Sequence, residues 1–169
     1  MALGACADAT RMRRALPASI AALALVAVPA HAREAGLWAT VNLCDTPSKP
    51  AAMGVRVSIP KHGSGQQQWV RIRVEWFDGT ARAWRPIGPG GDAGWKRLGR
   101  GKATVQGGTT FTFQPPAAGQ RLVLHGVVDL QWRKKGKVKG RAKLPTESGH
   151  ASPSDPQLAT SGDSCEITR

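Results

Sequence analysis

The chain has 169 residues and a formal net charge of +13, from 24 Lys and Arg against 11 Asp and Glu. This length is enough for one domain with a real hydrophobic core. The charge favours contact with anionic surfaces such as nucleic acid, acidic polysaccharide or lipid head groups, without selecting among them. Two well-separated cysteines beyond residue 32 and scattered histidines supply no cluster of metal ligands, so we predict neither a metal site nor a cofactor.

The first 32 residues have the pattern of a secretory signal peptide. Three arginines at 11–14 precede an apolar run at 15–28, and Ala30-His31-Ala32 supplies the small residues that signal peptidase needs. The run is too short and too interrupted by proline to span a bilayer. Cleavage after Ala32 predicts a secreted, extracellular or cell-surface-associated domain of residues 33–169, with 21 basic and 10 acidic residues and no integral membrane segment.

In the first half of this domain, apolar and polar residues alternate, as is typical of half-buried β-strands. Strands are expected at 37–43 and at 53–59. A third is expected at 69–76, with its valines and Ile72 inward and Trp69, Arg71 and Arg73 outward. Asp78-Gly79 predicts a hairpin turn into a short strand at 80–85.

The middle of the chain is rich in glycine and proline. Residues 86–101 are expected to form a long irregular connection, with at most a short strand at 96–98. Gly107-Gly108 predicts a turn, and 109–113 a strand that ends at Pro115-Pro116.

The stretch 119–144 holds the longest apolar alternation and the densest positive charge. Even-numbered residues from Leu122 to Trp132 are expected to face the core, and Gly136 can take the positive φ of a tight turn. The returning strand at 138–144 places a row of cations outward: Lys137, Lys139, Arg141 and Lys143. These cations either protect an exposed sheet edge from aggregation or form a docking surface for an anionic partner.

Two cysteines remain after the predicted cleavage, Cys44 and Cys165. An even pair in an oxidising compartment predicts a disulfide between the end of the first strand and a short terminal strand at 165–168. It would hold the loop at 146–164, and the loss of chain entropy predicts a stabilisation of about 4–5 kcal/mol.

About seven short strands separated by turns predict an antiparallel β-sandwich. Their order, the Asp-Gly hairpin and the long penultimate strand resemble an immunoglobulin or fibronectin-type-III-like domain over 37–144. The overall plan also resembles small secreted bacterial β-sandwich proteins of unknown function. The resemblance implies an all-β, immunoglobulin-like sandwich and no particular activity.

Interleaved tryptophan and arginine residues are the candidate ligand contacts. The stacking candidates are Trp69, Trp84 and Trp95, and the anion-binding candidates are Arg71, Arg73, Arg133, Lys134, Lys135, Lys137, Lys139, Arg141 and Lys143. Such rings could stack on sugars or bases while the cations hold phosphates or uronates. In the alternative interpretation, arginine stems pack over half-buried rings within the protein.

No catalytic constellation is predicted. His62 and Ser64 lie close in sequence but lack the strand-turn-helix context of a nucleophile elbow. We therefore predict a secreted, non-catalytic, basic binding or structural module that contacts anionic polysaccharide or another polyanion. The alternatives are a cationic toxin or antimicrobial protein, and a hydrolase that uses His62 or His125.

Overall fold

A computed structural model of the chain describes residues 35–100, 103–157 and 160–169. The predicted signal peptide therefore lies outside the described residues.

Nine β-strands and no helix form the described part of the chain, so it contains no helix that could cross a membrane. The strands are β1 (Trp38–Thr46), β2 (Lys49–Ile59), β3 (Gln67–Asp78), β4 (Ala83–Pro86), β5 (Asp92–Gly99), β6 (Val105–Thr112), β7 (Arg121–Lys134), β8 (Lys137–Pro145) and β9 (Ser164–Thr168).

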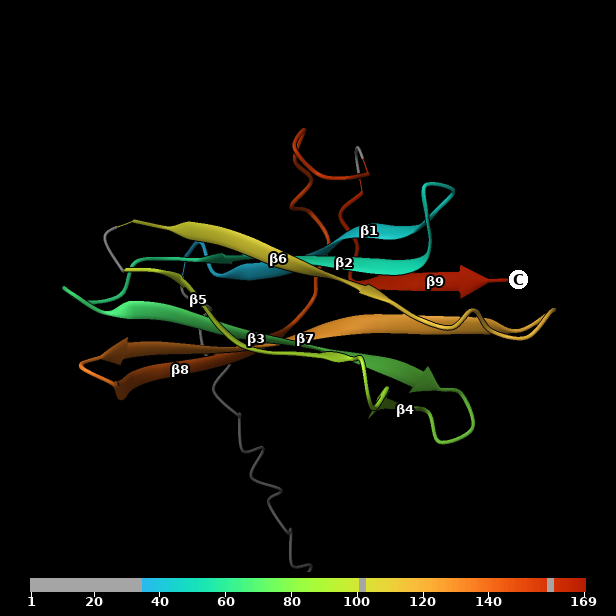
Figure 1. Ribbon diagram of the computed structural model, residues 1–169, viewed down its shortest axis with the longest axis horizontal. Coiled ribbons are helices and arrows are strands. Elements are labelled where there is room, and N and C mark those ends of the chain that lie inside the picture. Colours follow the sequence, from blue (N-terminus) through green and yellow to red (C-terminus); the bar gives the residue numbers. More distant parts are fainter. Residues whose placement is uncertain (1–34, 101–102, 158–159) are drawn as a thin grey trace, which may run out of the picture. The chain divides into compact units, whose positions relative to one another are not determined.

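The strands form two antiparallel sheets that stack face to face (Figure 1). One sheet has the order β1-β2-β6. The other has the order β4-β3-β7-β8. In this sheet β4 and β5 pair with successive parts of the same edge of β3, and β8 and β9 pair with successive parts of the same edge of β7. The predicted all-β antiparallel sandwich is confirmed, with nine strands instead of about seven.

The core lies between the sheets and consists of the inward residues of the long strands. Ile72 and Val74 of β3 and Leu124 and Leu130 of β7 are each at most 2% exposed. Trp132 is 2% exposed and belongs to the same cluster. The alternation in β3 and β7 thus identified the inward face correctly.

Two expectations about the middle of the chain are wrong. Residues 92–99, for which at most a short strand at 96–98 was expected, form the whole strand β5, which pairs with Gln68–Arg73 of β3 across two register shifts. Gly107 and Gly108 do not turn but lie within β6, opposite Val57 and Arg56. A Cβ on Gly108 would lie 2.4 Å from the Val55 carbonyl oxygen, so this glycine allows a close backbone approach.

The two predicted hairpin turns differ. Lys135 and Gly136 both have positive φ, 50° and 75°, and connect the paired residues Lys134 and Lys137. This is the geometry of a two-residue type I′ turn. The loop after Asp78 is longer than predicted, because Asp78 pairs with Ala83 and β4 begins there.

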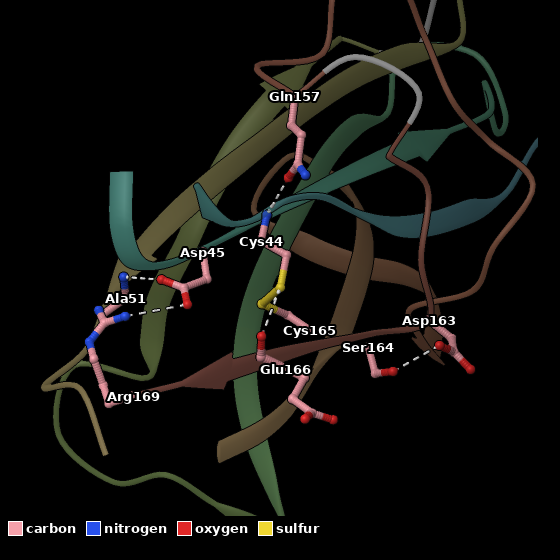
Figure 2. The surroundings of a disulfide bond; sticks show 9 residues. All are labelled: Cys44, Asp45, Ala51, Gln157, Asp163, Ser164, Cys165, Glu166 and Arg169. Carbon is pink, nitrogen blue, oxygen red and sulfur yellow. Dashed lines mark hydrogen bonds and ion pairs between the residues drawn. A yellow bond between two sulfur atoms is a disulfide. The ribbon is translucent and has the colours of Figure 1, made fainter. Parts of the chain in front are cut away.

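The predicted disulfide is present between Cys44 and Cys165 (Figure 2). Cys44 lies in β1 and Cys165 in β9, so the bond joins the two sheets. The side chain of Gln157 accepts a hydrogen bond from the Cys44 amide at 2.8 Å, as Figure 2 shows.

The loop after β8 covers part of the outward face of the three-stranded sheet. Thr40 and Ser58 point away from the core, yet they are 0% and 2% exposed. Thr40 is hydrogen-bonded to Ser161 at 2.9 Å, and the Asp155 carboxylate accepts a hydrogen bond from Asn42 at 2.9 Å. The sequence analysis predicted this loop but not the surface that it covers.

Candidate functional site

The outward face of the six-stranded sheet carries the predicted site residues. Residues directly opposite one another on neighbouring strands share a face. One row across the sheet consists of Trp95, Arg71, Asp129 and Lys143. The next consists of Trp69, Gln131 and Arg141. We call this surface, with Arg73, Arg133 and the lysines of the β7–β8 turn, the basic face.

Two arginines of β3 are paired with aspartates. Arg71 donates two hydrogen bonds from Nε to the Asp92 carboxylate, each at 3.0 Å, and its Nη2 contacts the same group. Hydrogen bonding by Arg71 lowers the pKa of Asp92 to about 2, and the same bond raises the pKa of Arg71. The pair is open to solvent, with side chains 38% and 37% exposed.

The second pair lies deeper in the face. Arg73 donates from Nε and Nη2 to Asp129 Oδ2, at 3.0 and 2.6 Å. These side chains are 29% and 24% exposed. Asp129 also lies directly opposite Arg71 and Lys143 on the neighbouring strands.

Arg133 brings two of the three candidate tryptophans together. Its guanidinium carbon lies 4.3 Å from the ring centroid of Trp69 and 5.2 Å from that of Trp95. Its Nε donates to Gln131 Oε1 at 2.7 Å. Arg133 is therefore engaged in cation–π contacts within the protein, the alternative that the sequence analysis raised for these residues.

The third tryptophan lies elsewhere. Trp84 stacks on His125, with ring centroids 3.7 Å apart, and contacts Phe77 edge to face. His125 is also 3.1 Å from the Glu75 carboxylate. Because six residues of β3 separate Glu75 from Trp69, this aromatic cluster lies roughly 20 Å from the Trp69 end of the face.

The remaining predicted cations are exposed on the β7–β8 hairpin. They are Lys134, Lys135, Lys137, Lys139, Arg141 and Lys143. Within the described residues, none of the six forms an ion pair with an acid. These side chains are therefore available to an anionic partner as far as the described part of the chain is concerned.

A shallow depression of about 490 Å³ lies on the basic face between β5, β3, β7 and β8. Its lining includes Trp95, Asp129, Gln131, Arg141 and Lys143. It offers one aromatic ring, one carboxylate, one amide and two cations that lack an acidic partner. This combination can bind a polar ligand by stacking and hydrogen bonding as well as by charge.

No metal centre is found among the described residues, because none of their His, Cys, Asp and Glu side chains gather in groups of three. The centroid of the His62 ring lies 4.8 Å from that of the core residue Trp132, so His62 is packed against the core. His125 is stacked and hydrogen-bonded as described above.

The sequence analysis missed the acidic and amide members of this site. Asp129 and Gln131 share the outward face of β7 with Arg133, and the alternation used for the core would have placed them there. Asp92 could not have been found in this way, because the strand that carries it, β5, was expected to be irregular.

The geometry defines an antiparallel β-sandwich with one open basic face. No known protein family matches the chain, and no curated protein matches its sequence. One solved structure with a detectable likeness is described as "Crystal structure of putative beta-galactosidase from bacteroides fragilis". The match has 16% identity and a TM-score of 0.39, and it covers 69% of this chain but only 17% of that one.

Proposed function

We propose that this protein is a secreted, non-catalytic binding module whose basic face contacts anionic polymers outside the cell or at its surface. The observation that carries the proposal is the difference between the two outward faces. The loop after β8 covers part of one face, whereas the other presents six cations that have no acidic partner among the described residues, beside a shallow depression.

The arrangement of these cations supports contact with an extended ligand. Lys139, Arg141 and Lys143 are exposed along β8, and three more lysines flank the turn. Such a row can contact successive charges of a linear polyanion, and each contact releases bound counterions. Affinity for the polymer should therefore fall steeply as the salt concentration rises.

The test is elution from a heparin column in a salt gradient, with a matched pair of quadruple variants. The test variant replaces Lys134, Lys135, Lys137 and Lys139 by Gln. The control replaces by Gln four cations that lie neither at the β7–β8 turn nor in the depression: Lys49, Arg82, Arg85 and Arg121. The two variants have the same net charge, and each alters one residue with positive φ.

We expect the wild type to elute above physiological ionic strength, about 0.15 M. The hairpin variant should elute much earlier than the control, because it loses contacts as well as charge. Equal elution of the two variants would show that net charge alone governs retention and would contradict the proposal. Elution of the wild type below about 0.15 M salt would also contradict it.

A further inference from the structure

The depression on the basic face is chemically unlike a site for densely charged polymers. Asp129 contributes a carboxylate to its lining, held by Arg73 at 2.6 Å and partly exposed. This carboxylate is offset in charge by Arg73, so it weakens the attraction of this point for closely spaced phosphates without creating a net repulsion. It readily accepts hydrogen bonds from hydroxyl groups, however, because an ionised carboxylate is an acceptor only.

The arginine pairs on β3 also reduce the positive charge at this point. Arg71 and Arg73 are paired with Asp92 and Asp129, so their charges are largely compensated. The uncompensated cations that line the depression are Arg141 and Lys143 on β8. The depression therefore has a positive side at β8 and a mixed donor and acceptor region over β3 and β7.

The remaining wall supplies a flat apolar surface. Trp95 lines the depression from β5, and the stacked Arg133 guanidinium restrains its ring. Aromatic rings pack well against flat molecules that carry polar groups at their edges. Gln131, which lies between Trp69 and Arg141 in register, adds an amide on the same surface.

We propose that this depression binds one carboxylated sugar unit, a hexuronate, of an anionic polysaccharide. Trp95 packs against the sugar ring, and Asp129 and Gln131 hydrogen-bond its hydroxyls. Arg141, assisted by Lys143, binds the carboxylate, because a guanidinium fork matches a planar carboxylate in two parallel hydrogen bonds. This assignment rests on the proposed function and names its ligand class.

The test compares three hexamers by isothermal titration calorimetry at fixed salt: oligogalacturonate, inorganic polyphosphate and neutral maltohexaose. The wild type should bind oligogalacturonate more tightly than polyphosphate, although both carry repeated negative charges. Maltohexaose should bind much more weakly than oligogalacturonate, since it lacks the carboxylate.

Three variants then separate the contacts. Trp95→Ala should weaken oligogalacturonate about tenfold, the scale of a lost stacking contact, and polyphosphate far less. Asp129→Asn should lower the preference for oligogalacturonate over polyphosphate about tenfold, because it replaces an ionised acceptor for hydroxyls by a weaker neutral one and leaves the charge of Arg73 free to attract phosphate. Arg141→Lys keeps the charge but loses the fork, and should weaken the binding of oligogalacturonate.

Trp84→Ala is the matched control, since Trp84 lies in the aromatic cluster and not in the depression. It should change neither affinity, and circular dichroism verifies that each variant is folded. A preference that is unchanged in Trp95→Ala and Asp129→Asn would overturn the hexuronate site while leaving polyanion binding intact. Absence of binding to both anionic hexamers and to heparin would instead refute the proposed function.

A sulfated galactan hexamer completes the comparison. Equal or tighter binding of this hexamer would overturn the assignment to a carboxylated sugar, because it would show that the depression binds anionic sugars without selecting a carboxylate.

Discussion

Each outward face of the sandwich has an arginine–aspartate ion pair, and the two pairs differ in their exposure to solvent. On the covered face, Arg56 and Asp155 have side chains that are 13% and 1% exposed. On the basic face, Arg71 and Asp92 are 38% and 37% exposed. The covered pair joins a loop to a sheet, and its burial predicts that loss of either partner is strongly destabilising. The open pair is weakly coupled to folding, because solvent screens it, and its groups remain accessible to a ligand.

The geometry of the covered pair supports this contrast. Arg56 Nε lies 2.8 Å from Asp155 Oδ1 but without a well-directed hydrogen bond, whereas Nη2 donates to Oδ2 at 3.1 Å. The Asp155 carboxylate also accepts hydrogen bonds from Asn42 and from the Ser152 amide. One buried carboxylate thus organises the loop over β1 and β2.

The largest expected effect comes from removal of the disulfide. The double variant Cys44→Ala/Cys165→Ala should lose up to about 4–5 kcal/mol in free energy of unfolding, since the bond closes a loop with a sequence separation of 121. Urea unfolding measures the loss. Where the variant is still folded, heparin elution should be unchanged, because the bond lies away from the basic face. An unchanged urea midpoint would contradict this prediction.

The second effect separates the two arginine pairs directly. Asp155→Ala should cost about 3 kcal/mol, because it leaves Arg56 largely buried without its counter-ion. Asp92→Ala on the basic face should cost only a small fraction of that. Urea unfolding of both variants, with hydrogen exchange of the Thr40 and Cys44 amides, tests the difference. Equal losses would show that burial does not distinguish the two faces.

A third, smaller effect concerns the turn that presents the basic face. Gly136→Ala should cost about 1 kcal/mol, because φ at this residue is 75° and a Cβ is strained there. Gly79→Ala is the control, since its φ is ordinary and a Cβ would meet no atom within 4 Å. Thermal or urea unfolding compares the two. A loss in Gly79→Ala as large as that in Gly136→Ala would argue against the assigned turn.

The smallest effect is the pH dependence of the open pair. The folded pKa of Asp92 is about 2, below the usual value of 3.8, so the pair stabilises the protein above about pH 4. This contribution is lost as pH falls from that range through about 2. The wild type minus Asp92→Asn difference in unfolding free energy should be small and constant near neutrality, and should vanish in acid. A difference that grows in acid would have the wrong sign.

The sequence predicted those parts of the fold in which side chains alternate. The inward and outward faces of β3, β7 and β8 follow from period-two spacing, and with them the positions of Arg71, Arg73 and Arg141. The same reasoning failed at Gly107 and Gly108, because glycine marks both turns and close backbone contacts. Only the partner strand, with Val55 against Gly108, distinguishes the two cases.

Contacts between distant segments were also beyond sequence reasoning. The burial of Thr40 depends on Ser161, which is 121 positions away in the chain. Asp129 and Asp92 are isolated acids in the sequence, and only strand pairing brings them to Arg73 and Arg71. The candidate depression therefore required the register of four strands, not the motifs within any one of them.

The bond between Cys44 and Cys165 also constrains the order of events during folding. Cys44 emerges early in synthesis, and its partner follows only after 121 further positions. The native disulfide therefore cannot form before β9 has been synthesised.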